Sequence, residues 1–224
     1  MTVAEYIKQL LSFEEYSFSL NELQRELSRN QTSIRSELSR LVKKREIVNL
    51  RKGYYLIIPP RYAASGKLPI QLYGEKLFRH LNQNYYLGFY TAAKIHGASH
   101  QQVQRDYVLT TTPKLNNISK GTLDIRFFTT SHWPDNNILT KKADAGTYKI
   151  SSPGLTALDL LHHQTKLGGL NRILAVVDEL VEEIDEFDLV NLLSWYPNRS
   201  TLQRFGFLLE EIGKNEDHQE KIFD

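Results

Sequence analysis

Short polar and basic side chains recur at helical spacing between residues 30 and 43, and their chemistry is hydrogen bonding and neutralisation of negative charge. A helix turns 100° per residue, which places most of this set opposite the apolar stripe of the helix, with Arg35 at the edge of that stripe. Small hydroxyls let a helix lie close in the major groove of a duplex, where Arg and Lys reach base edges or phosphates. We predict a DNA contact made by Gln31, Thr32, Ser33, Arg35, Ser36, Ser39, Arg40 and Lys43.

A second pair of cations, Arg51 and Lys52, stands just before Gly53 between two strand-like runs at residues 47–50 and 54–58. The change of period predicts a hairpin whose basic tip touches the DNA backbone or the minor groove. From Arg25 to Arg61 the chain has ten Lys or Arg against three Glu, a net charge of +7. Such a field favours polyanions through counterion release.

The helices that carry these residues are indicated by their caps and periods. Ser19 and Glu22 have the S-x-x-E spacing of a capping box, which predicts a helix from about residue 20 to residue 28. Asn30 is placed to cap the next helix. The apolar stripe of that helix consists of Ile34, Leu38, Leu41 and Val42.

An opening amphipathic helix completes a three-helix core, with Ala4, Ile7, Leu10 and Leu11 on its apolar side. The order of helices followed by a hairpin predicts a winged helix-turn-helix over residues 1–60, ended by Pro59 and Pro60. The alternative is that this unit mediates protein contacts, as some winged helices do.

Residues 61–224 are predicted to form a second, α+β domain. Helices are expected at residues 72–81 and 85–97, and strands at 106–112, 122–130 and 148–150 form a small antiparallel sheet. Ser152 and Pro153 open a helix that Gly168 and Gly169 stop. Helices at 170–183, 187–195 and 200–212 follow, the last opened by a capping box at Ser200. The predicted fold class is therefore α+β throughout, with a helical, acidic end.

Composition excludes several classes of protein. With 41% hydrophobic and 24% charged residues in 224, the chain resembles ordinary globular proteins rather than disordered ones. It has no cysteine, which excludes disulfides and thiolate catalysis. Early charges argue against a secretory signal, and no apolar run approaches the ~20 residues of a membrane helix, so a cytoplasmic location is expected. Net charge is +4 over residues 1–62, +6 over 63–170 and −8 over 171–224.

Histidines and carboxylates are the remaining candidates for chemistry. His96 and His100 are four residues apart, but Gly97 is expected to end the helix between them, and adjacent His162 and His163 cannot chelate together. We therefore predict no metal site and no cofactor. The acidic helix residues Asp178, Glu179, Glu182 and Glu183 are read as a solvated face or as a docking surface for a basic partner.

Two rival functions stay open at this point. The first is a ligand-sensing transcription regulator, which requires a deep apolar pocket in the second domain. The second is a nuclease built on Asp106, Asp124 and Arg126, although its lysine partner is missing and strand alternation alone accounts for these residues. No convincing catalytic residue emerges, so we expect a protein that is not an enzyme.

With these elements in place, the chain resembles the AbiEi family of antitoxins. The resemblance runs from the winged domain through residues 85–97 (YYLGFYTAAKIHG) and 150–160 (ISSPGLTALDL) to 203–209 (QRFGFLL). It implies a repressor that places its winged domain on inverted repeats in its own promoter, with two copies on the DNA. It also implies that the C-terminal domain neutralises a nucleotidyltransferase toxin encoded next door. Such antitoxins are described as type IV, meaning that neutralisation needs no stable complex; direct binding stays open.

Overall fold

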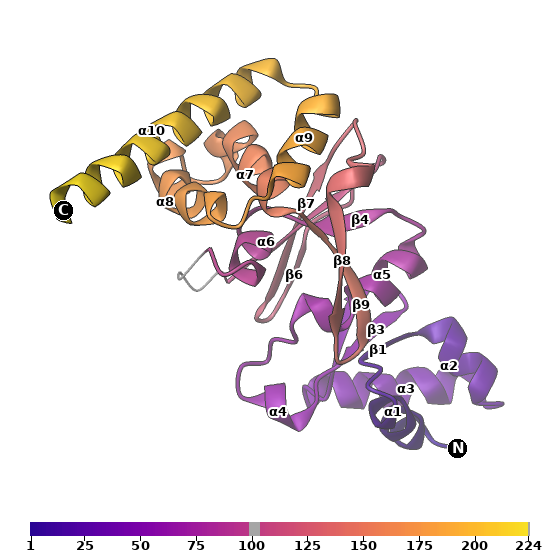
Figure 1. The fold of residues 1–224 in the computed structure, drawn as a ribbon. Coiled ribbons are helices and arrows are strands. Elements are labelled where there is room, and N and C mark those ends of the chain that lie inside the picture. The colour runs from indigo at the N-terminus through magenta and orange to yellow at the C-terminus, as the bar shows by residue number, and fades with distance from the viewer. Residues whose placement is uncertain (99–103, 224) are drawn as a thin grey trace. The chain divides into compact units, whose positions relative to one another are not determined.

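The computed structural model describes residues 1–98 and 104–223, with side chains described as far as Glu211 except that of Asp135 (Figure 1). It is an α+β fold of helices and mainly antiparallel strands. The chain divides into two compact units. Unit 1 comprises Met1–Tyr85, Lys114–Phe127 and Thr140–Lys149, and unit 2 comprises Tyr86–Pro113, Phe128–Leu139 and Ile150–Asp224. These units differ from the expected division after residue 60, because later segments pack with the N-terminal one; a functional boundary there stays a prediction.

The N-terminal part of unit 1 has its own core. Its helices and strands are α1 (Val3–Ser12), β1 (Ser17–Ser19), α2 (Leu20–Glu26), α3 (Gln31–Lys43), β2 (Ile47–Arg51) and β3 (Tyr54–Ile57). The strands form an antiparallel sheet in the order β1-β3-β2, in which Ser17 and Val48 both pair with Leu56. Side chains from all three helices and all three strands meet in one hydrophobic cluster, so this segment is held together by contacts within itself.

The predicted caps of this segment are confirmed. Ser19 accepts from the backbone N–H of Glu22, and the Glu22 carboxylate accepts from that of Ser19, which is the expected capping box. Asn30 Oδ1 accepts from the backbone N–H of Thr32 at 2.9 Å and so caps α3. These bonds satisfy N–H groups that have no partner inside a helix.

Two predicted apolar faces need correction. In α1 the buried residues are Val3, Tyr6 and Leu10, because the core lies slightly to one side of the expected stripe and leaves Ala4 exposed. In α3, Ile34 and Leu38 are buried as predicted, but Val42 is 36% exposed. Val42 lies in the last turn, so α3 ends with more exposed surface than its periodicity indicates.

The described residues include a second sheet of six strands in the order β6-β7-β5-β4-β9-β8. The predicted strands are present as β5 (Asp106–Thr110), β7 (Leu123–Thr129) and β9 (Gly146–Ser151), and the strands that were not predicted are β4 (Tyr85–Leu87), β6 (Ile118–Lys120) and β8 (Ile138–Ala143). β6 and β7 are antiparallel, whereas β4 and β9 run parallel with Leu87 opposite Ile150. The sheet is therefore larger than predicted and includes one parallel pair.

The helix predicted at residues 85–97 is partly wrong. Tyr85–Leu87 form β4, and the helix α6 (Phe89–Ile95) begins only after the extended Gly88. Its first residue, Phe89, has a φ of 51°, outside helix geometry. A short run of buried apolar residues has no periodicity that separates a strand from a helix, which explains the error.

The remaining helices of unit 1 are α4 (Pro60–Ala63), the 3-10 turn η1 (Ile70–Leu72) and α5 (Gly74–Leu81). Unit 2 is largely helical, with α6, η2 (Asp135–Asn137), α7 (Pro153–His162), η3 (Gln164–Lys166), α8 (Leu170–Val181), α9 (Glu186–Trp195) and α10 (Arg199–Phe223). Ser152 caps α7 and Pro153 is its first residue, as predicted. The expected cap at Ser200 is wrong, because Asn198 Oδ1 accepts from the Thr201 N–H at 3.0 Å. Within the described ranges, no helix has the length and apolar character needed to cross a bilayer.

We expect Gly154→Ala to destabilise unit 2. A Cβ at Gly154 would lie 2.6 Å from Leu192 Cδ1 and 2.8 Å from Asp188 Oδ2. That carboxylate is held in place, since it accepts from the Gly154 N–H at 2.8 Å and from Asn137 Nδ2. Overpacking of this kind costs about 1–3 kcal/mol. The matched control is Gly206→Ala in α10, where nothing lies within 4 Å and helix propensity should raise stability by up to ~1 kcal/mol. Equal urea midpoints for the two variants would contradict this packing.

Candidate nucleic-acid interface

The exposed side of α3 gathers the side chains that the sequence singles out. Ile34 and Leu38 anchor the opposite side in the core. As a consequence Gln31, Thr32, Arg35, Ser36, Ser39, Arg40 and Lys43 are all exposed, and Ser33 is half-buried. The structure therefore brings eight of the ten predicted contact residues together on one helix, which we call the α3 face.

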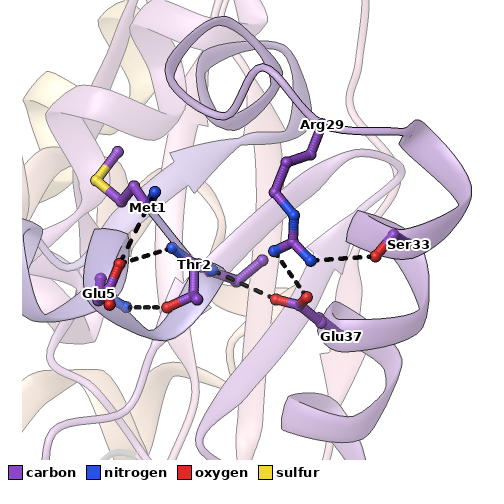
Figure 2. Close-up of polar contacts among 7 residues, drawn as sticks. Met1, Thr2, Glu5, Arg29, Ser33 and Glu37 are labelled. Atoms are coloured by element: carbon purple, nitrogen blue, oxygen red, sulfur yellow. Dashed lines mark hydrogen bonds and ion pairs between the residues drawn. The ribbon is translucent and has the colours of Figure 1, made fainter.

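A polar network fixes α3 against the turn before it and against the start of α1 (Figure 2). Arg29 Nη1 pairs with Glu37 Oε1 at 2.9 Å, and Arg29 Nη2 donates to Ser33 Oγ at 3.4 Å. The other Glu37 oxygen accepts from the Val3 backbone N–H at 3.3 Å. Glu37 is the acidic residue of α3, and these bonds hold its carboxylate against Arg29 and the start of α1. The sequence does not predict this network, because Arg29 lies in the turn before α3 and reaches Glu37 only through the path of that turn.

The start of α1 is held by a capping box of its own. The Glu5 carboxylate accepts from the Thr2 backbone N–H at 2.8 Å, and Thr2 Oγ1 accepts from that of Glu5 at 3.2 Å (Figure 2). The N-terminal ammonium lies 4.0 Å from Glu5. Val3 is thereby held where its N–H can reach Glu37, so the first turn of α1 supports the orientation of α3.

The two hairpin cations have different surroundings. The hairpin turns through Lys52 and Gly53, whose φ of 74° suits glycine, and Lys52 is exposed. Arg51 is half-buried: its Nη2 donates to the Asn116 carbonyl oxygen at 2.7 Å, and its guanidinium lies 5.3 Å from the centre of the Phe127 ring. Burial lowers the pKa of Arg51 from its usual value. A DNA contact by Arg51 stays a prediction, and its side chain already contacts Asn116 and Phe127.

The two units carry opposite net charges. Unit 1 carries 20 Lys or Arg against 10 Asp or Glu, a net of +10, and unit 2 carries 8 against 16, a net of −8. The basic residues between positions 114 and 149 fold with unit 1 rather than unit 2. Net charges counted over consecutive stretches of the sequence do not reveal this, because parts of unit 2 lie between the segments of unit 1.

Five glutamates of unit 1 line one groove. An open groove of about 1010 Å³ runs along α1, α2 and α5, and its lining includes the carboxylates of Glu14, Glu15, Glu22, Glu26 and Glu75. Arg25, Lys76 and Arg79 also line it. Lys76 pairs with Glu15, and Arg79 pairs with Glu75 at 3.6 Å. No residue of α3 lines this groove. Residues 31–57, which form α3 and the hairpin, carry seven Lys or Arg against two Glu, and we call the surface that they form the positive side of unit 1.

Two of the three residues considered for a nuclease pair with each other. Arg126 clasps Asp124 with Nε–Oδ1 and Nη2–Oδ2 distances of 2.8 and 3.1 Å. Among the described residues, no group of three or more His, Cys, Asp or Glu could hold a metal ion. His96 Nε2 lies 2.8 Å from the Ser151 carbonyl oxygen, and His100 lies outside the described residues. The structure thus adds no support for the nuclease alternative.

The ligand-sensing alternative requires a deep apolar pocket in the second domain. In the described part of unit 2, a shallow depression of about 210 Å³ is lined by Leu174, Ala175, Val177, Asp178 and Leu208. Ligand pockets usually enclose about 300–1,000 Å³ and bring several polar groups together. This depression has neither property.

Asp159 is a carboxylic acid of unit 2 with a raised pKa, and it lies in the core. It is buried in α7, where burial raises its pKa to about 7, and the Tyr86 hydroxyl donates to its Oδ2 at 3.0 Å. Burial also lowers the pKa of His163 to about 4. Asp159 is buried in the core, and His163 is half-buried against the rings of Phe89 and Phe128, so we assign both groups to the fold.

The raised pKa of Asp159 predicts a dependence of stability on pH. The native state binds this proton more tightly than the unfolded chain, so the added stability is fully present below pH 4 and is lost as pH rises through about 7. Asp159→Asn keeps an acceptor for Tyr86 without the charge. Between pH 5 and pH 8 the wild type should lose about 2–3 kcal/mol relative to this variant. His163 is present in both proteins, so its contribution cancels in the comparison. If the stability of the two proteins changed in parallel with pH, Asp159 would not be the source of the pH dependence.

The fold and this surface define a class: an α+β protein that joins a basic unit with an exposed polar helix to an acidic, mostly helical unit. Residues 86–211 match the family model described as the AbiEi antitoxin C-terminal domain. This match covers more than half of the chain, and the chain belongs to the AbiEi family of antitoxins, as its sequence resemblance predicted.

Two other comparisons add little. No curated protein matches the chain. Among solved structures, it is similar to the crystal structure of an antigenic nucleotidyltransferase-like protein from Paracoccidioides brasiliensis, with a TM-score of 0.37 and 9% sequence identity over 65% of this chain and 86% of that one. A likeness at this level has no bearing on function.

Proposed function

We propose that this antitoxin is a DNA-binding repressor of its own operon that also neutralises a nucleotidyltransferase toxin, and that it acts in the cytoplasm without catalytic activity. The observation that carries the DNA-binding half is the α3 face, where seven exposed polar or basic side chains stand on a helix anchored by Ile34 and Leu38. Family membership supports the antitoxin half.

The arrangement of residues 1–60 supports a winged helix-turn-helix. α2 and α3 are separated by a four-residue turn, residues 27–30, and the β2–β3 hairpin follows α3 directly. In helix-turn-helix proteins the second helix enters the major groove, and residues near its N-terminus reach base edges. That position belongs here to Gln31 and Thr32. Arg40 and Lys43 lie further along the same helix, within reach of bases or phosphates.

The positive end of the α3 dipole adds to this arrangement. Asn30 caps the helix, and no acidic residue stands in its first turn. Helix N-termini attract phosphate through their free N–H groups and their partial positive charge. The basic residues in the last turn, Arg40 and Lys43, extend the favourable field along the helix. Inverted repeats in the promoter would accept two copies of the chain, one on each half-site.

The toxin-neutralising half is assigned to unit 2, where an apolar stripe on α9 is uncovered. Phe187 is 74% exposed, Val190 57% and Leu193 59%, at steps of three residues. Just before this stripe in the sequence stand four exposed carboxylates, those of Glu182, Glu183, Asp185 and Glu186. From position 173 to position 198 the chain has no Lys or Arg. An apolar face bordered by negative charge fits a toxin surface of apolar groups bordered by Lys and Arg.

Two measurements in cells test the function as a whole. A reporter fused to the promoter upstream of the gene should be repressed by the intact chain, and co-expression with the nucleotidyltransferase encoded next door should restore growth. Full reporter activity in the presence of the folded chain would refute repression. Growth arrest that the chain leaves unchanged would refute neutralisation of that toxin.

A further inference from the structure

A second hairpin lies beside the first within unit 1. β6 pairs with β7 with Ser119 opposite Asp124 and Lys120 opposite Leu123, so the chain turns through Gly121 and Thr122. β6 packs next to β2, the first strand of the basic hairpin. At the turn, Thr122 Oγ1 donates to the Gly66 carbonyl oxygen at 2.6 Å. The β6–β7 hairpin is therefore held at both its flank and its tip.

Arg51 joins the two hairpins. Its Nη2 donates to the carbonyl oxygen of Asn116, just before β6, and its guanidinium covers the ring of Phe127 on β7. The next residue, Asn117, accepts through Oδ1 from the Phe127 N–H at 2.9 Å. Since its charge is used for these contacts, Arg51 positions the second hairpin, which leaves Lys52 as the exposed cation of the first.

The two hairpins border an open groove of about 510 Å³. It is lined by Leu50, Arg51, Lys52, Asn117, Ile118, Ser119 and Lys120. Lys52 and Lys120 come from opposite sides and are both exposed, as are Asn117 and Ser119. No carboxylate is among these lining residues, and nearby Asp124 is paired with Arg126. Ser119 Oγ donates to Asp124 Oδ1 at 3.4 Å. The ammonium groups on both sides and the Asn117 amide between them suit a chain of phosphodiesters.

We propose that the β6–β7 hairpin is a second wing that binds the DNA backbone, with Lys52 and Lys120 on the phosphates that enter this groove. The proposal rests on the proposed function and adds to it a contact from outside residues 1–60. Phosphate contacts carry no sequence information. Lys120 therefore contributes to affinity for every duplex and to its salt dependence, and leaves the preference for the promoter unchanged.

The test is fluorescence anisotropy with the full chain, a promoter duplex and a scrambled duplex of equal length. Removing one phosphate contact lowers the slope of log affinity against log salt by about 0.9, which corresponds to roughly an eightfold loss at 100 mM salt. We expect that loss for Lys120→Ala on both duplexes, and a larger one for Lys120→Glu. Lys166→Ala, an equally exposed lysine of unit 2, serves as the matched control and should change neither quantity.

Arg40→Ala separates failure of this proposal from failure of the proposed function. If both Lys120 variants bind like the wild type while Arg40→Ala binds more weakly, the second wing is overturned and the DNA-binding function stands. If neither position affects binding, both are overturned. Lys120 is exposed, so its replacement is expected to leave folding intact. Equal urea midpoints for the variants and the wild type would verify this.

Discussion

Replacing Arg40 and Lys43 together by alanine should weaken binding to the promoter by at least about 2 kcal/mol, roughly 30-fold. Both side chains are exposed on the α3 face, three residues apart on one side of the helix. A side chain that reads a base contributes about 1–3 kcal/mol, and one that meets phosphate contributes less but to every sequence. Anisotropy titration of promoter and scrambled duplexes separates these two cases. The fold should be unaffected, since neither residue is part of the core cluster.

The matched control for this double variant removes two cations from elsewhere in unit 1. Lys8 is exposed on α1, and Arg25 is exposed on α2, where it lines the groove that contains five glutamates. Lys8→Ala combined with Arg25→Ala makes the same change in net charge. If both double variants lose the same affinity, general charge rather than the α3 face determines binding, and the assignment of α3 as the recognition helix is refuted.

Replacing Phe187 and Leu193 together by alanine should abolish toxin neutralisation while DNA binding stays intact. Buried apolar anchors at the centre of an interface often contribute 2 kcal/mol or more each, and these two residues present most of the uncovered apolar stripe on α9. The loss should be visible as failed growth rescue on co-expression with the toxin. It should also be visible in isothermal titration of toxin into antitoxin, as affinity lower by two orders of magnitude or more.

Phe13→Ala is the control for lost aromatic surface. Phe13 is 69% exposed in unit 1, close to the exposure of Phe187. Rescue of growth by the Phe187 and Leu193 variant at the level of the wild type would refute a role for the α9 stripe. Loss of rescue without any measurable toxin binding by the wild type would mean that neutralisation needs this face but no stable complex, in keeping with a type IV antitoxin.

Sequence reasoning was most successful where structure is decided locally. The capping boxes at Thr2 and Ser19 use residues three positions apart, and only the second was predicted, but both are of a kind that sequence can reveal. The α3 face was predicted because a helix converts spacing directly into direction. The predicted strand at 122–130 is similarly local, because buried Leu123, Ile125 and Phe127 alternate in it with less buried residues.

Long-range contacts explain what was missed. β4 and β6 have three residues each, too few to show a period. β4 pairs with β9, more than 60 residues further along the chain, which no local pattern reveals. Arg51 looked like a free hairpin cation because its partners, Asn116 and Phe127, lie more than 60 positions away. The separation of charge between the units depends on segments that return to unit 1 after a part of unit 2, which no count along the chain can anticipate.

Salt-dependent binding of the full chain to its promoter duplex tests the central claim most directly, because the claim is that the positive side of unit 1 binds duplex DNA. Between 50 and 200 mM salt, log affinity should fall linearly with log salt, with a slope of about −0.9 for each phosphate contacted. The Arg40 and Lys43 double variant should show a shallower slope. Affinity that stays constant over this range, or the absence of binding at the lowest salt by a chain shown to be folded, would contradict the account.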